Sequence, residues 1–244
     1  MQNTVHFILQ GKGGIGKSFV STLIAQYFNR KGAHTVCFDT DQENTTFKHY
    51  AALNVQHVQV MDESRVIDQK GFDKLIESIL EQEGTFVVDT GANTFSNLLA
   101  YMVENSVIEI LNSNGRKVFI HTIIGGGDTL LDTANGFNSV AQAVEQVGGT
   151  SLVLWLNEHF GSMQHNGNPF QESKVFKAHE DKLVGVVVLH DRNKQTFGDD
   201  IKRMNTARLT VDEVLQSPNF GIMEKSRIRT VATDVFNQLD KVVW

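Results

Sequence analysis

A glycine-rich segment near the start of the chain constrains its fold more than any other feature. Residues 11–18 read Gly-Lys-Gly-Gly-Ile-Gly-Lys-Ser, which completes the pattern G-x-x-x-x-G-K-S. An apolar run at residues 5–9 precedes the segment, and apolar residues recur at helical spacing from Phe19 to Phe28. A strand, a glycine-rich turn and a helix in this order make a loop whose backbone N–H groups face a phosphate. The segment therefore predicts an α/β fold that binds a nucleotide.

Each part of this loop has an expected role. Lys17 is expected to reach the β and γ phosphates, and the Ser18 hydroxyl to bind Mg²⁺. The glycines let the backbone approach the polyphosphate closely. The residues expected to contact the nucleotide are Gly11, Lys12, Gly13, Gly14, Ile15, Gly16, Lys17, Ser18 and Phe19.

The composition is that of an ordered α/β protein. The 244 residues are 41% hydrophobic and include two prolines, which suits one folded domain over residues 1–244. Cys37 is the only cysteine, so an internal disulfide and a paired-cysteine metal site are excluded. No apolar stretch approaches the roughly 20 residues that span a bilayer, and no secretion signal is recognisable. We expect a cytoplasmic protein, whose contact with the inner membrane would be peripheral and made through a partner.

Net charge limits the expected partners. The formal charge of −6 gives no general attraction to nucleic acid. Two groups of basic residues alternate with apolar residues in expected helices: Lys202, Arg203 and Arg208, and Lys225, Arg227 and Arg229. We interpret both groups as solvated helix faces, and direct DNA contact stays open.

Apolar runs alternate with helical patterns along the rest of the chain. Strands are expected at residues 35–38, 55–61, 85–88, 118–120, 151–156 and 184–189. Helices are expected at 44–50, 72–80, 128–147 and in the tail, and one or two helices at 94–112. Several of these strands are apolar throughout, as in strands buried on both faces. We therefore predict a doubly wound, mostly parallel sheet with helices on both faces. Glycines 125–127 are interpreted as a strand-to-helix turn, and residues 159–168 as a loop without a metal site.

Polar residues follow several expected strands. Asp39 and Asp41 follow the strand at 35–38, Asp89 follows 85–88, and Asn157 follows 151–156. Because the carboxyl ends of strands face the ligand crevice in open α/β sheets, these side chains are expected near the phosphate loop. Asp89 stands where a carboxylate would complete the Mg²⁺ site begun by Ser18. Helix capping is the alternative role for Asp89 and Asp41.

The lysine at position 12 makes the loop resemble one superfamily. Lys-Gly-Gly-x-Gly-Lys-Ser, at residues 12–18, is similar to the deviant Walker A motif of the ParA/MinD ATPases. The resemblance implies an ATP-bound homodimer in which Lys12 acts in trans on the partner subunit's nucleotide. Lys17 would then act in cis, on the nucleotide of its own chain.

Two strand ends extend this resemblance. Asp39-Thr40-Asp41 is similar to the superfamily's D-x-D segment, which implies that Asp39 supports the metal and Asp41 activates the attacking water. Asn157 matches an asparagine that hydrogen-bonds adenine. Gln42 replaces a common proline, and residues 185–190 replace a usual Gly-Val-Ile-Pro, so the far wall of the base pocket is left open. The implied catalytic residues are Lys12, Lys17 and Asp41, and the implied metal-binding residues are Ser18, Asp39 and Asp89.

Longer segments resemble a narrower family, the plasmid conjugal-transfer TraL proteins. These segments lie within residues 9–14, 39–55, 121–137, 155–157, 208–210 and 236–240, and together extend over nearly the whole chain. The resemblance implies an ATP-binding switch protein of conjugative transfer, dimeric with ATP, with weak ATPase activity that a partner stimulates. Its partners would be conjugation or plasmid-positioning proteins.

Other functions of the same fold stay open. A plasmid-partition or membrane-positioning ATPase is one alternative, and a small-molecule ligase or kinase is another. The tail carries Asp234 and Asp240 instead of forming a basic amphipathic helix, so it gives weak support to membrane binding.

Overall fold

A parallel sheet of seven strands forms the centre of the computed structural model, which describes residues 3–62 and 66–244. Its order is β3–β2–β4–β1–β5–β6–β9, and all adjacent strands run parallel. The strands are β1 (Thr4–Ile8), β2 (Thr35–Asp39), β3 (Gln56–His57), β4 (Thr85–Asp89), β5 (Lys117–Gly125), β6 (Thr150–Asn157) and β9 (Leu183–Leu189). The sheet grows outward from β1 in both directions, which confirms the predicted doubly wound fold and puts the ligand crevice at the end of β1.

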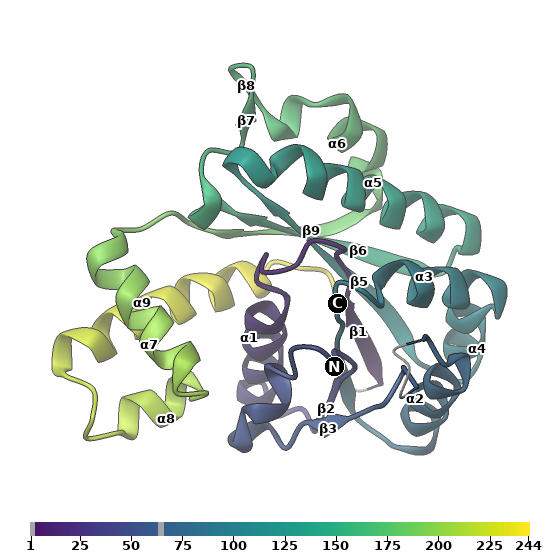
Figure 1. The fold of residues 1–244 in the computed structure, drawn as a ribbon, viewed down its shortest axis with the longest axis horizontal. Coiled ribbons are helices and arrows are strands. Elements are labelled where there is room, and N and C mark those ends of the chain that lie inside the picture. Colours follow the sequence, from purple (N-terminus) through teal and green to yellow (C-terminus); the bar gives the residue numbers. More distant parts are fainter. Residues whose placement is uncertain (1–2, 63–65) are drawn as a thin grey trace.

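Helices cover both faces of the sheet (Figure 1). One face carries α2 (Gln69–Glu81), α3 (Phe95–Glu104), α4 (Val107–Ser113), α5 (Leu130–Val147) and α6 (Lys174–His179). The other carries α1 (Lys17–Arg30), α7 (Asp199–Thr206), α8 (Val211–Gln216) and α9 (Ile222–Leu239). In Figure 1, α7, α8 and the first part of α9 extend beyond the sheet as a lobe beside α1.

Shorter elements complete the chain. Helical turns lie at Phe47–His49, Ala51–Leu53, Gly127–Thr129, Glu158–Phe160, Phe170–Glu172, Glu180–Lys182 and Lys194–Gly198, and a hairpin pairs β7 (Gln164–His165) with β8 (Asn168–Pro169). Within residues 3–62 and 66–244, every helix is too short or too polar to span a lipid bilayer.

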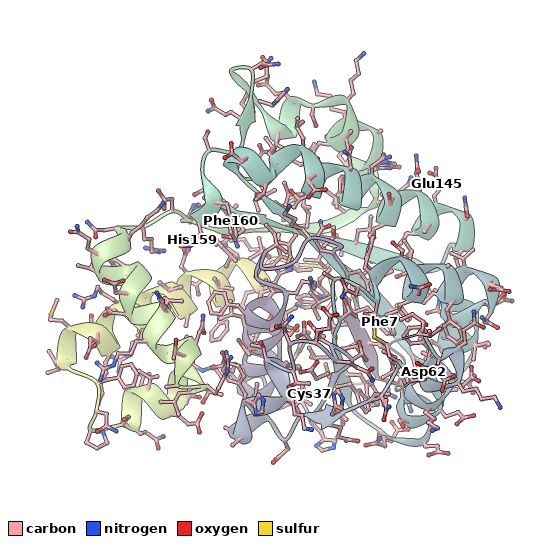
Figure 2. All side chains as sticks on the ribbon, in the orientation of Figure 1. Phe7, Cys37, Asp62, Glu145, His159 and Phe160 are labelled. Atoms are coloured by element: carbon pink, nitrogen blue, oxygen red, sulfur yellow. The ribbon has the colours of Figure 1, made fainter. Side chains whose placement is uncertain are left out.

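Successive residues of the central strands pack into opposite layers, as the period of two in a strand requires. Phe7 packs under the layer of α2 to α5, whereas Ile8 packs under α1. Cys37 on β2 is buried in the α1 layer (Figure 2). Burial raises the pKa of its thiol to about 12, so Cys37 behaves as a small apolar core residue.

The segment between β2 and α2 differs from its expected structure. The helix predicted at 44–50 is two separate helical turns, Phe47–His49 and Ala51–Leu53. The carboxylates of Asp39 and Asp41 accept hydrogen bonds from backbone N–H groups in this segment, and such bonds compete with a regular helix. The strand predicted at 55–61 is reduced to Gln56–His57, because only these two residues pair with the end of β2.

Other expectations were correct in type and differ in detail. The helical pattern at 94–112 gives two helices, broken where Ser106 adopts a φ of 49°. Glycines 125–127 form the predicted turn into α5. The segment 159–168 contains the β7 strand as well as loop. β9 was expected to be buried, but it is the edge strand, and several of its side chains are half-exposed.

Candidate nucleotide-binding site

The glycine-rich loop connects β1 to α1 at the carboxyl end of the sheet. Gly14 and Gly16 have φ values of 71° and 105°, a region that other residues enter only with strain. Gly16 is the N-cap of α1, and no side chain caps this helix. The N–H groups of the first helical turn therefore point to a position where an anion can accept them.

Lys17 is buried against its own loop. Its Nζ donates to the backbone oxygen of Lys12 at 3.0 Å. Burial lowers the pKa of this amine, while the carboxylates of Asp89 and Asp41 act in the opposite direction. The side chain thus spans the concave side of the loop, where it would meet a bound phosphate.

Asp89 ends β4 next to the first turns of α1. Ser21 Oγ donates to Asp89 Oδ1 at 2.8 Å, whereas Oδ2 is buried and accepts no hydrogen bond from the described residues. Burial raises the pKa of Asp89 to about 7, with a further rise from Asp39, while the hydroxyls of Ser18 and Ser21 lower it. A buried carboxylate oxygen without a donor fits a cation or its water shell.

Asp39 and Asp41 organise the segment that follows β2. Asp39 lies opposite Asp89 in the strand register, and its two oxygens accept from the N–H groups of Asp41 and Lys48, each at 2.9 Å. Burial raises the pKa of the Asp39 carboxyl. Asp41 Oδ1 accepts from two backbone N–H groups, those of Glu43 and Asn44, so Asp41 does form a local turn cap. Roles at the metal and at the attacking water stay predictions for these two carboxylates.

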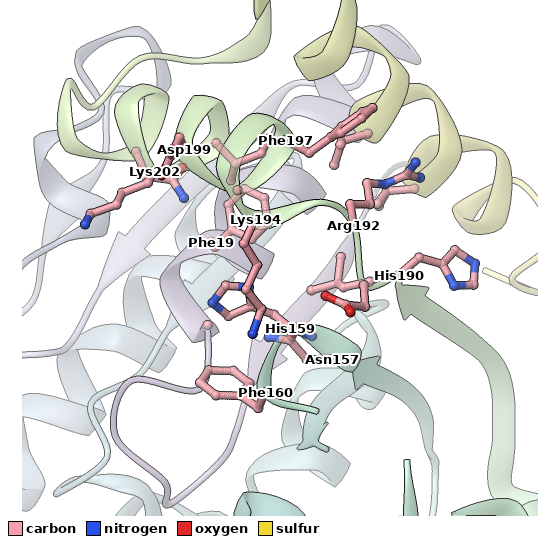
Figure 3. A pocket seen from close by; sticks show the side chains of 18 of the residues that line it. Phe19, Asn157, His159, Phe160, His190, Arg192, Lys194, Phe197, Asp199 and Lys202 are labelled. Carbon is pink, nitrogen blue, oxygen red and sulfur yellow. The ribbon is translucent and has the colours of Figure 1, made fainter. Parts of the chain in front are cut away.

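Two adjoining cavities open onto the loop. The smaller cavity, of about 440 Å³, is lined by Lys17, Ser18, Asp41 and Tyr50, among others. The larger, of about 700 Å³, is lined by the end of β6, the segment after β9, and helices α7 and α9. Figure 3 shows this larger cavity, with Asn157, His159 and Phe160 from β6 and its following turn. The two cavities share five lining residues: Gly14, Gly16, Phe19, Asn205 and Arg208.

Asn157 joins the end of β6 to the phosphate loop. Its Nδ2 donates to the backbone oxygen of Ile15 at 3.0 Å, and its Oδ1 accepts from the His159 N–H at 3.2 Å. The side chain also lines the larger cavity. The structure therefore gives Asn157 a role in holding the loop, and its expected contact with adenine stays a prediction.

Lys12 lies apart from this group. It lines neither cavity, and its Nζ forms an ion pair with Asp132 Oδ2 at 2.9 Å. Asp132 belongs to the first turn of α5, 120 positions further along the chain. The sequence pattern gave no reason to connect the two residues.

Members of both basic groups are paired with acidic side chains. Arg203 pairs with Glu224, and Arg227 pairs with Asp200. Arg208, which we had interpreted as part of a solvated face, lines both cavities instead. Sequence reasoning assigned no site role to Arg208, Tyr50 or Asn205, because their proximity to the loop arises only from tertiary structure.

Protein side chains alone do not make a metal centre here. Within residues 3–62 and 66–244, no three His, Cys, Asp or Glu side chains are placed to hold a metal ion. A Mg²⁺ ion at Ser18 would therefore need phosphate oxygens among its ligands, as in other phosphate loops.

Comparison with known families identifies the class of protein. Residues 6–215 match the CobQ/CobB/MinD/ParA nucleotide binding domain, so the chain belongs to this family. Within it, the chain is a member of the TraL family. Two Escherichia coli proteins, each named Protein TraL, are 37% identical to it over 237 residues, which is 97% of this chain and 97% of each relative.

Solved structures share the fold at low sequence identity. The cell division ATPase MinD of Pyrococcus furiosus aligns with a TM-score of 0.53 and 14% identity, over 96% of this chain and 99% of that one. MinD of Pyrococcus horikoshii, solved with Mg-ADP, aligns with a TM-score of 0.52 and 14% identity, over 95% and 96%. These likenesses establish the α/β architecture.

Proposed function

We propose that this chain binds Mg-ATP, hydrolyses it slowly, and forms a homodimer when ATP is bound, as a switch in plasmid conjugative transfer. Residues 1–244 would act as one nucleotide-binding unit. Membership of the TraL family supports the link to conjugation, and the nucleotide-binding domain supports the ligand.

One arrangement carries the proposal. Lys17 and Ser18 line a cavity at the open end of α1, and the buried Asp89 carboxylate lies next to Ser18. This places an ammonium, an uncapped helix N-terminus and a hydroxyl around one position, which suits a polyphosphate. The adjoining larger cavity, with Asn157 in its wall, has room for the nucleoside.

The residues present fit a magnesium ion. Ser18 would bind it, with Asp89 and Asp39 supporting its water ligands. Bound Mg²⁺ would neutralise part of the phosphate charge during transfer. The Mg-ADP in the Pyrococcus horikoshii MinD structure supports the same cofactor here.

Hydrolysis requires a group that orients water at the γ phosphate. Asp41 lines the phosphate cavity, and its carboxylate lies against Gly91 just after β4. We assign Asp41 to this role. Because its Oδ1 is held by two N–H groups, the carboxylate is fixed in place before substrate binds.

Association between subunits would depend on Lys12. Lys17 already occupies the phosphate cavity of its own chain, whereas Lys12 lies outside both cavities. Lys12 would contact the phosphates held by a facing subunit. The γ phosphate then supplies the contact that differs between ATP and ADP states. Conjugation or plasmid-positioning proteins would be partners of the ATP-bound form.

Calorimetry tests the nucleotide site. We expect wild type and Lys70→Ala to bind Mg-ATP equally, since Lys70 is an exposed residue at the start of α2. Lys17→Ala should bind at least about tenfold more weakly, because a charge-assisted contact to phosphate is lost. Equal affinity of Lys17→Ala and wild type would refute the proposed site.

A further inference from the structure

Arg208 occupies the junction of the two cavities. It lies in the turn between α7 and α8, is half-buried, and belongs to the wall that the cavities share. The same shared wall contains Gly16 of the phosphate loop and Phe19 of α1. Arg208 thus lies at the candidate nucleotide site although it is far from the phosphate loop in the sequence.

The charge of Arg208 has no acidic partner in the described part of the chain. Other arginines in the second half of the chain do: Arg192 pairs with Asp234, Arg203 with Glu224, and Arg227 with Asp200. Arg208 Nη1 donates to the backbone oxygen of Asn205 at 2.9 Å. A guanidinium has five N–H donors, so several remain for an anion.

The backbone of Arg208 is fixed at the end of α7. Arg208 has a φ of 54°, a left-handed conformation that is uncommon outside glycine and asparagine. Its N–H donates to Asn205 O at 3.2 Å, and the following N–H, of Leu209, donates to Met204 O at 3.3 Å. Thr210 then caps α8 in a capping box. The bonds from the Arg208 and Leu209 N–H groups and the left-handed residue form the Schellman arrangement that commonly ends an α-helix, and they fix where the backbone of Arg208 lies.

We propose that Arg208 binds the α phosphate of the nucleotide in its own subunit. The inference rests on the proposed function. Lys17 is assigned to the β and γ phosphates in the smaller cavity, and Asn157 faces the nucleoside in the larger one. The α phosphate joins these two parts of a nucleotide, and the junction of the cavities carries Arg208. A guanidinium matches phosphate oxygens in geometry and charge.

A nucleotide bound to Arg208 would connect two parts of the molecule. Arg208 belongs to the lobe of α7, α8 and α9, whereas the phosphate loop belongs to the sheet. A nucleotide held by both would tie the lobe to the sheet. Since ADP and ATP both carry an α phosphate, this contact would be made in both nucleotide states.

Calorimetric titration with Mg-ADP and with a non-hydrolysable Mg-ATP analogue tests the assignment. Arg208→Ala should lower the affinity for both nucleotides by the same factor, about ten- to hundredfold. Arg229→Ala is the matched control, because Arg229 is exposed on α9 and lines neither cavity. If Arg208→Ala lost affinity only for the ATP analogue, or lost no affinity for either nucleotide, the assignment would be overturned.

Arg208→Gly separates binding from folding. Glycine adopts the left-handed conformation without strain, so the unliganded variant should melt at or above the wild-type temperature. It should lose nucleotide affinity as Arg208→Ala does. Wild-type affinity in both variants would overturn the role of Arg208 alone. If the wild type itself bound neither nucleotide, the proposed function would fail, and this inference with it.

Discussion

Lys12 Nζ and Asp132 Oδ2 lie 2.9 Å apart, in an ion pair that joins the phosphate loop to the first turn of α5. The two side chains are 43% and 61% exposed, and exposed pairs of this kind contribute about 1 kcal/mol or less. A pair this weak can be exchanged for a stronger contact. On our account, the phosphates of a facing subunit compete with Asp132 for Lys12.

Asp132→Asn should therefore favour the dimer. Removing the carboxylate frees Lys12 in both subunits, so ATP-dependent dimerisation should occur at a protein concentration up to about thirtyfold lower, since two pairs of about 1 kcal/mol each correspond to that factor. Light scattering over a concentration series measures the shift. Asp128→Asn is the control, because Asp128 is exposed one turn earlier and forms no ion pair among the described residues. A weaker dimer in Asp132→Asn would contradict this competition.

Asp41→Asn should separate binding from turnover. The asparagine retains an oxygen for the two N–H groups that Asp41 caps, but it cannot take a proton from water. We expect unchanged affinity for Mg-ATP and a hydrolysis rate at least about a hundredfold lower. The rates would be compared under identical conditions, with Asp181→Asn, on a distant exposed turn, as control. Wild-type turnover in Asp41→Asn would move the catalytic role to another residue.

Gly16→Ala should damage the phosphate loop more than Gly13→Ala. Gly16 has a φ of 105°, and an added Cβ would lie 3.3 Å from Asn157 Nδ2. Gly13 has neither restriction, since nothing lies within 4 Å of an added Cβ. We expect Gly16→Ala to lose about 1–3 kcal/mol of stability and most nucleotide affinity. Equal effects of the two changes in urea unfolding would show that the left-handed turn is not required.

The adjacent strands β1 and β5 carry a buried histidine pair. His6 Nδ1 lies 3.0 Å from His121 Nε2, and Trp155 Nε1 donates to His121 Nδ1 at 3.0 Å. Because an indole nitrogen can only donate, His121 must carry its proton on Nε2, and His6 must accept it. The remaining His6 nitrogen then donates to Thr4 Oγ1 at 3.0 Å. Both rings are fixed as neutral tautomers.

Burial lowers the pKa of His121 to about 3, and burial together with His121 lowers the pKa of His6. In the folded state both imidazoles therefore stay neutral at pH values where the same histidines of the unfolded chain, with a pKa near 6.5, become protonated. This contribution to stability is complete above pH 6.5 and is lost as the pH falls toward 3. Nitrogen NMR at pH 5 should show both imidazoles neutral. A midpoint near 6.5 for either ring would contradict the assignment.

Asp89 should give the opposite pH dependence. Its folded pKa, about 7, lies above the ordinary value, so its contribution is present at low pH and is lost as the pH rises toward 7. Between pH 7 and pH 5, Asp89→Asn should lose more stability on acidification than wild type. Parallel unfolding profiles for the two proteins would contradict the raised pKa.

Much of the architecture was predictable because its signals are local. The apolar strands and the glycine pattern each lie within a few residues, and they predicted β1, β4, β6 and α1 closely, whereas β5 was predicted only over residues 118–120 and extends to Gly125. The burial of β9 was overestimated, because its composition is that of an inner strand while its position is at the edge. The pattern of residues shows which side chains a strand carries, but it does not show whether the strand lies inside the sheet or at its edge, because that depends on the topology.

The candidate site was predictable only in part. Asp39, Asp89 and Asn157 were predicted to lie near the phosphate loop because each stands at the end of a strand, and the carboxyl ends of parallel strands lie at the same edge of the sheet. The partners of these residues could not be inferred: Asn157 bonds to Ile15, and Lys12 to Asp132, across more than a hundred positions. Arg208 carried a misleading signal, because a basic residue beside a helix ordinarily indicates a solvated face.

Nucleotide-dependent association of wild type and Lys12→Ala tests the proposed switch most directly. The molar mass of each would be measured by light scattering with Mg-ADP and with a non-hydrolysable Mg-ATP analogue. The account predicts that wild type doubles in mass only with the ATP analogue, and that Lys12→Ala binds the analogue but stays monomeric. A mass that is the same with both nucleotides, or a dimer that forms equally well without Lys12, would contradict it.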